Sequence, residues 1–235
     1  MAFADLPLRF EPNVGQADAR VNFLTRNRRY TLFLMPTEIL ITLNRNVDDR
    51  MPSKHRSHPD EQQPASSSTG LVRMHLEDAN PRAEIKGRSR LPGTTNYFLG
   101  DDPSRWHVNI ANYESVEYRD VYPGIQLVFY GRRGGLEFDF VVAADADPDI
   151  IRLSFEGIEN MLLDDFGNLI ADTSAGRLFL HKPFIYQENH GRRNPVAGSF
   201  VLDAVNHVRL QVAAYDTGRP LVIDPPAAIL NISGG

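Results

Sequence analysis

Cysteine is missing from all 235 residues of the sequence. Disulfide bonds, thiolate metal sites and cysteine nucleophiles are therefore excluded. Basic residues are in the minority, with 25 Lys and Arg against 30 Asp and Glu, which gives a formal net charge of −5. Because no large basic field is present, a nucleic-acid partner is disfavoured.

Long apolar runs are also missing. No stretch of the sequence approaches the roughly 20 apolar residues that a transmembrane helix needs, so we predict no membrane span. The segment Met1–Asp5 has neither a basic n-region nor an apolar h-region. We therefore expect no signal peptide in this chain.

Short strand-like segments and turn residues alternate along the chain, and we find no amphipathic helix of ordinary length. This pattern predicts an all-β fold of two packed β-sandwich-like units with few or no helices. The predicted strands are Val21–Thr25, Tyr30–Met35, Glu38–Leu43, Leu71–Leu76, Asn96–Leu99, Tyr113–Arg119, Ile125–Tyr130, Leu136–Val142, Arg152–Phe155, Asn160–Leu163, Leu169–Asp172, Arg177–Leu180, Phe184–Glu188, Phe200–Asp203 and His207–Ala214.

Two breaks in composition suggest the domain organisation. Residues 44–70 are rich in Ser, Pro and charge and poor in apolar side chains, so we predict a disordered loop. The acidic, proline-containing segment Asp145–Asp149 is a candidate boundary. The prediction is an N-terminal β unit over 1–145, a C-terminal β-sandwich unit over 146–226, and a tail or truncated start of a repeat region over 227–235.

Glu137 and Asp139 form the best candidate catalytic pair. Strand alternation places both carboxyl groups on one face, and retaining glycosidases use two carboxyl groups about 5 Å apart. The third acid of a Glu-x-Asp-x-Glu strand is absent, because Val141 takes its place. The polar outer face of a half-buried strand explains the pair without chemistry. We therefore predict no catalytic residue and no enzymatic activity.

The best candidate metal motif is Asp145-x-Asp147-x-Asp149 with Glu156, which has nearly the spacing of an EF-hand calcium loop. Ile150 occupies the position where that loop needs glycine for its sharp turn. The flanking segments also read as strands rather than helices. The seven histidines form no zinc-binding spacing. An acidic turn is the better interpretation, and we predict no metal site and no cofactor.

Aromatic residues gather in the first half of the chain and offer a possible sugar-binding surface. Exposed rings of Trp106, Tyr97 and Tyr113 would bind a carbohydrate by stacking. The alternative is that the aromatic residues pack in the core and anchor turns, as amphipathic rings commonly do. Trp106, Tyr118, Tyr122 and Tyr186 are the candidate anchors.

Several longer strings occur in a fixed order between Leu6 and Pro225 and resemble a known family. They are Leu6–Gln16 (LPLRFEPNVGQ), Asn96–Gly100 (NYFLG) with Trp106, Tyr118–Ile125 (YRDVYPGI), Leu136–Val142 (LEFDFVV) with Asp147-Pro148, Lys182-Pro183 with Tyr186–Glu188 (YQE), and Arg219–Pro225 (RPLVIDP). Together they resemble the N-terminal domain of unknown function of bacterial cell-surface proteins that carry SBBP (β-propeller) repeats.

The resemblance implies an exported, extracellular or cell-surface module without enzymatic activity, and it transfers no catalytic residue. Its partners are unknown; a surface glycan or another surface protein would fit. In that family a signal peptide precedes the first motif and a repeat follows the last, whereas here the sequence ends at Gly234-Gly235. We therefore expect a head domain alone.

The leading hypothesis is a structural or adhesive head domain; the alternatives are a carbohydrate-binding module and a glycan-active hydrolase that uses Glu137 and Asp139.

Overall fold

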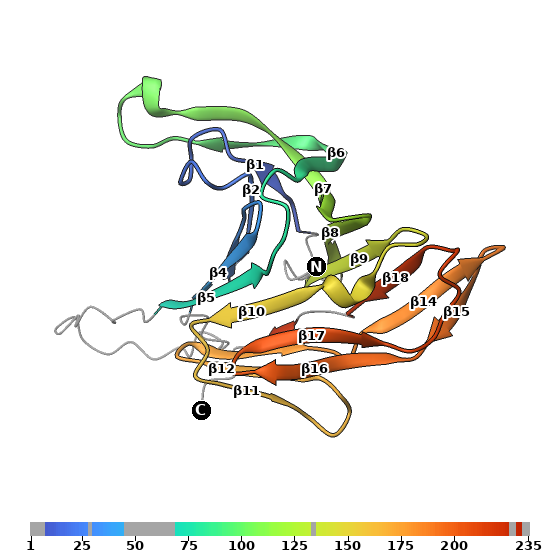
Figure 1. Cartoon of the computed structure of the whole chain (residues 1–235). Helices are drawn as coiled ribbons and strands as arrows, with labels where there is room; N and C mark the ends of the chain where they lie inside the picture. The colour runs from blue at the N-terminus through green and yellow to red at the C-terminus, as the bar shows by residue number, and fades with distance from the viewer. Residues whose placement is uncertain (1–7, 28–29, 45–68, 133–134, 226–228, 232–235) are drawn as a thin grey trace, which may run out of the picture.

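The computed structural model describes residues 8–27, 30–44, 69–132, 135–225 and 229–231. Over these residues the chain forms three antiparallel β-sheets and two short 3-10 helices, η2 (Pro103–Arg105) and η3 (Pro148–Ile150) (Figure 1). The predicted all-β, sandwich-like fold is confirmed. None of the described segments forms a helix long and apolar enough to cross a lipid bilayer.

The first sheet has eight strands in the order β1-β2-β3-β4-β5-β10-β17-β16, and the second has seven in the order β15-β14-β18-β9-β8-β7-β6. A third, four-stranded sheet has the order β11-β12-β13-β19. The bounds are β1 Glu11–Pro12, β2 Phe23–Arg26, β3 Tyr30–Leu34, β4 Glu38–Asn44, β5 Thr69–Leu76, β6 Glu84–Tyr97, β7 His107–Tyr122, β8 Ile125–Arg132, β9 Gly135–Val142, β10 Arg152–Glu156, β11 Asn160–Leu163, β12 Leu169–Thr173, β13 Gly176–Leu180, β14 Phe184–Asn189, β15 Arg192–Val196, β16 Gly198–Ala204, β17 His207–Val212, β18 Leu221–Asp224 and β19 Ile229–Asn231.

One buried apolar cluster holds the sheets together. It includes Leu32 from the first sheet, Phe129 from the second and Leu178 from the third. Alternation along β3 and β9 places every second side chain in this cluster, as the period of a strand requires. The third sheet therefore completes the core.

Two tyrosines of β7 connect the second sheet to the first. The buried Tyr118 hydroxyl donates to the carbonyl of Met35 at 3.0 Å, and the Tyr122 hydroxyl donates to the carbonyl of Arg152 at 3.1 Å. Each hydroxyl satisfies a backbone carbonyl near a strand end. The interpretation of these two residues as anchors is confirmed.

Strands from both sides of Asp145 share the two large sheets. β10 pairs with β5 in the first sheet, and β18 pairs with β9 in the second. The third sheet, in contrast, contains only strands that follow Asp145. The division of the chain into separate units at Asp145 stays a prediction. Both large sheets contain strands from before and after this position.

The ends of the predicted loop 44–70 belong to strands, because Asn44 pairs with Thr69 and Leu43 pairs with Gly70. The rest of that loop, 45–68, lies outside the described residues. In the predicted tail 227–235, the described residues Ile229–Asn231 form β19, which pairs with β13.

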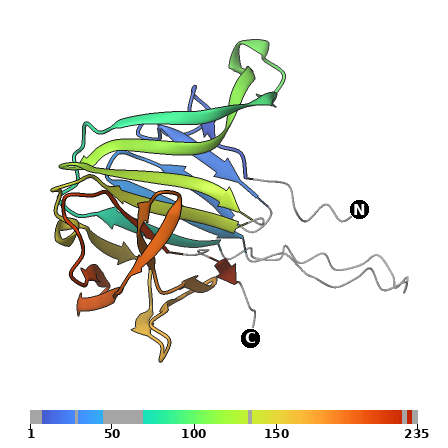
Figure 2. The same cartoon turned by 90° about the vertical axis from the view of Figure 1, so that its right-hand side faces the viewer.

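A long two-stranded arm, formed by β6 and β7, projects from the body of the molecule in both views (Figures 1 and 2). The strands shift register twice, between Arg90 and Thr94 and between Thr95 and Tyr97. η2 lies in the turn that joins them. The sequence predicted only the end of β6, around Asn96–Leu99.

Candidate functional site

An acidic cluster lies on the outer face of the second sheet. Glu137 and Asp139 share this face of β9, as alternation predicted, and they stand opposite Tyr130 and Val128 of β8. The face is not a simple solvated surface, because Glu137 is only 4% exposed. The interpretation of the pair as the polar outer face of a half-buried strand is therefore wrong for Glu137, because its side chain is buried on that face.

Asp224 of β18 completes the cluster, and sequence reasoning missed it. Ile223 pairs with Phe140, which brings the next two residues, Asp224 and Asp139, to neighbouring positions on the outer face. Asp224 is 7% exposed, and its carboxyl group lies beside that of Asp139. The sequence does place Asp224 within the family-like string Arg219–Pro225. Its position beside Asp139, however, follows only from the pairing of two strands that are far apart in the chain.

Two carboxylate oxygens of this cluster have no hydrogen-bond donor among the described residues, namely Oε2 of Glu137 and Oδ1 of Asp224. The guanidinium of Arg132 lies 3.7 Å from Glu137 Oε2, which is an ion pair without a hydrogen bond. The Tyr130 hydroxyl donates to Asp139 Oδ1 at 2.9 Å. The cluster thus concentrates negative charge with few donors.

Burial, together with the charge of the neighbouring Asp224 carboxyl, raises the pKa of Asp139 to about 7. Burial also raises the pKa of Asp224, which Arg132 and Arg193 partly offset. Both shifts favour the neutral acid, since two close carboxylates out of water cannot both ionise easily. The cluster can hold a proton at neutral pH.

Aromatic rings lie beside the cluster on β14. Phe184 and Tyr186 are stacked with centroids 5.3 Å apart, and the Arg193 guanidinium lies 4.4 Å from the Tyr186 ring centroid. The stacked rings and the arginine over Tyr186 thus border the acidic cluster on the side of β14 and β15.

The three aromatic residues predicted to bind sugar all lie on the arm: Tyr113 on β7, Tyr97 at the end of β6 and Trp106 in the turn between the two strands. Tyr113 packs edge-on against Phe23 and covers Gly87, where an added Cβ would lie 2.4 Å from the Tyr113 ring. The Tyr97 hydroxyl donates to Glu11 at 2.7 Å. Trp106 lies at the arm tip. Ligand binding by these residues stays a prediction.

The arm tip exposes several large apolar side chains. Phe98 is 62% exposed and Trp106 is 37% exposed, and Leu99 and Val108 beside them are also exposed. The Phe98 and Trp106 rings are perpendicular, with centroids 5.1 Å apart, and the Trp106 indole N–H donates to the carbonyl of Gly100 at 3.0 Å. Trp106 therefore anchors the turn, as predicted, while its ring stays accessible.

The acidic segment Asp145–Asp149 runs from a turn into η3, which begins at Pro148. Asp147 accepts a hydrogen bond from the backbone N–H of Asp149, so it caps this helix. Glu156, the fourth member of the calcium-like motif, instead pairs with Arg73 on β5 at 3.0 Å. Within the described ranges, no group of three or more acidic or histidine side chains could hold a metal ion.

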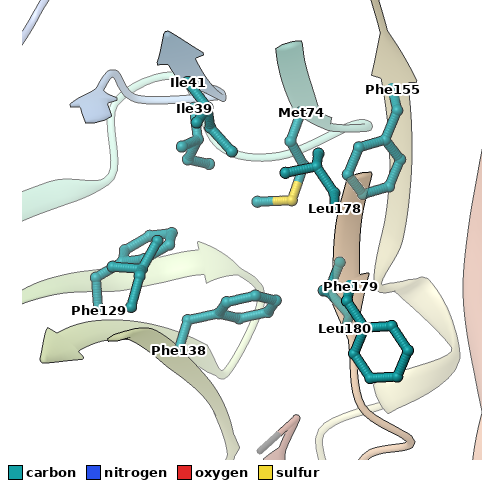
Figure 3. Close-up of a pocket in the computed structure, with 10 residues that line it drawn as sticks. Ile39, Ile41, Met74, Phe129, Phe138, Phe155, Leu178, Phe179 and Leu180 are labelled. Atoms are coloured by element: carbon teal, nitrogen blue, oxygen red, sulfur yellow. The ribbon is translucent and has the colours of Figure 1, made fainter. Parts of the chain in front are cut away.

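A small cavity lies inside the core, where the three sheets meet. Ile39 and Met74 of the first sheet, Phe129 and Phe138 of the second and Leu178 of the third are among its lining residues (Figure 3). All ten lining side chains are apolar. This space has no group for acid–base chemistry, and it is best described as part of the core.

The family sequence model described as a domain of unknown function (DUF7948) matches residues 10–226. A search of curated proteins found no match, and neither did a search of solved structures. The match covers all three sheets except β19, and it includes the arm and the acidic cluster. The chain therefore belongs to the DUF7948 family of domains of unknown function.

Proposed function

We propose that this chain is a non-catalytic structural or adhesive head domain of a bacterial surface protein, and that it binds another surface protein through the tip of the β6–β7 arm. The single observation that carries this proposal is the apolar tip itself. Phe98, Leu99, Trp106 and Val108 are exposed together at the end of a projecting hairpin. Aromatic side chains grouped in this way are typical of protein-binding surfaces.

The roles of the family-like strings support a scaffold rather than an enzyme. In the first string, the Asn13 amide donates to the carbonyls of Asp18 and Val21 and accepts from the N–H groups of Gly15 and Ala17. Such contacts shape a loop and leave no free group for chemistry. Tyr118 and Tyr122 in a later string are likewise engaged with backbone carbonyls.

The surface location and the link to SBBP repeats are part of the proposal and rest on the resemblance of these ordered strings. Net charge and composition are compatible with them. A hydrolase that uses Glu137 and Asp139 is less favoured, because a 4% exposed Glu137 leaves little room for a sugar ring beside it.

To test the proposal, labelled wild-type domain and a Phe98→Ser/Trp106→Ser double variant are titrated onto intact cells of the organism that encodes it. We expect the double variant to bind at least about tenfold more weakly, because two anchors each contribute about 1–2 kcal/mol. Val205→Ser is the matched control, since Val205 is 86% exposed at the turn between β16 and β17, away from the arm. Equal binding of wild type and double variant contradicts the proposal.

Binding to the same cells after treatment with protease or with glycosidases shows whether the partner is a protein or a glycan. Loss of binding after protease treatment supports a protein partner. Loss only after glycosidase treatment would instead favour the carbohydrate-binding alternative through Trp106, Tyr97 and Tyr113. The perpendicular Phe98 and Trp106 rings weigh against that alternative, because sugar platforms present one flat face.

A further inference from the structure

Asp139 and Asp224 lie at neighbouring positions on the same face of β9 and β18, and Asp224 is only 7% exposed. Two carboxyl groups this close and partly withdrawn from water cannot both ionise easily. We infer that Asp139 and Asp224 share one proton at neutral pH, and that this acid–carboxylate pair is a pH-operated latch that holds β18 to β9.

The hydrogen bond from Tyr130 indicates which oxygen of Asp139 carries the shared proton. Tyr130 donates to Oδ1 of Asp139 at 2.9 Å, so that oxygen acts as an acceptor. The second oxygen of Asp139 then carries the proton and donates it to Asp224. Asp224 Oδ1 has no hydrogen-bond partner in the described part of the chain. The shared proton is therefore a principal source of stabilisation for this buried carboxyl group.

The charged groups that face the pair come from four strands. Glu137 on β9 favours retention of the proton because it adds negative charge, whereas the neutral Tyr130 hydroxyl on β8 opposes it by donating a hydrogen bond to Asp139. Arg132 on β8 and Arg193 on β15 oppose it by stabilising the charge on Asp224. Tyr186 on β14 is also neutral, since burial raises the pKa of its hydroxyl.

The direction of the pH effect follows from the folded-state pKa of Asp139, which burial raises from 3.8 to about 7. The folded protein thus binds this proton more tightly than the unfolded chain does. The latch contributes fully below about pH 4, and its contribution falls as the pH rises, until it is lost above about pH 7. Two charged carboxylates then repel each other across β9 and β18.

The position of the latch gives it a structural consequence. β18 lies between β9 and β14 in the second sheet, and it ends at Asp224, two residues before the end of the family match at 226. Ionisation of both acids weakens the pairing of this strand with β9. The latch therefore controls how firmly the end of the domain is attached.

The test compares the denaturant stability of the wild type, Asp139→Asn and Glu114→Gln between pH 5 and pH 7. Asparagine imitates the protonated acid and donates to Asp224 at any pH. We expect the wild-type folding equilibrium constant to fall by about tenfold per pH unit relative to Asp139→Asn.

Glu114→Gln is the control: Glu114 is an exposed carboxyl on β7, so this variant should follow the wild type. Carboxyls paired with arginine, such as Glu117, have a lowered pKa and titrate below this window.

Carbon-13 NMR of the aspartate carboxyl groups in the wild type provides a measurement that does not depend on any variant. We expect one carboxyl resonance with a midpoint near pH 7, and we expect amide protection in β18 to fall above that pH after correction for intrinsic exchange. All aspartates titrating below pH 5, or an Asp139→Asn variant with the wild-type pH dependence, would overturn the proposal.

Discussion

At the scale of single residues, Gln187 shows how one buried amide can organise a loop. Its Nε2 lies 2.8 Å from the carbonyl of Asp216 and within reach of those of Arg219 and Pro220, while its Oε1 accepts from the Asp216 N–H. Replacement by leucine keeps the size but leaves these backbone groups without a partner. We expect Gln187→Leu to destabilise the fold by about 2–4 kcal/mol.

Urea unfolding followed by fluorescence of Trp106 measures this effect. Gln126 on β8 is exposed, so Gln126→Leu serves as the control and should change stability by no more than about 0.5 kcal/mol. A loss below 1 kcal/mol for Gln187→Leu would show that the loop between β17 and β18 does not depend on this side chain.

At the scale of elements, the turn between β10 and β11 depends on Gly157. Its φ is +79°, and a Cβ at this position would lie 2.0 Å from the carbonyl oxygen of Leu71. Gly157→Ala therefore combines backbone strain with a clash against β5, and we expect a loss of about 3 kcal/mol or more in thermal unfolding. Gly191 has φ +75° but open space around it, so Gly191→Ala should cost only about 1–2 kcal/mol. Equal losses in the two variants would contradict the clash.

The elements also show which parts of the fold were predictable. Strands with strong apolar alternation, such as β9, were found nearly to the residue. Most of β6 was missed because its 14 residues include charges, Pro92 and Gly93 and show no apolar alternation. β15 contains Arg192, Arg193 and Pro195 and was missed for a similar reason.

The acidic cluster illustrates a second limit. Glu137 and Asp139 were recognisable from local alternation alone. Asp224 lies 85 positions further along the chain, and its place beside Asp139 depends on β18 inserting between β9 and β14. No local pattern encodes that insertion, so the buried pair and its raised pKa values could not be read from the sequence.

At the scale of the whole molecule, both large sheets are built from strands that precede and follow Asp145. A fragment of residues 1–145 would lack β10 beside β5 and β18 beside β9, which exposes two long strand edges and part of the core. We expect this fragment to show no cooperative unfolding by circular dichroism, whereas the intact chain should unfold in one transition. A separately folded 1–145 fragment would instead establish the boundary that composition predicted.

The interior position of β18 also constrains the order of events during synthesis. Residues 221–224 are nearly the last of the family domain to be made, yet they form an interior strand of the seven-stranded sheet, between β14 and β9. Until these residues have left the ribosome, β9 and β14 lack the strand that pairs with both of them. The domain therefore stays incompletely folded while most of it is being translated, which leaves the nascent chain available to chaperones before the sheet is complete.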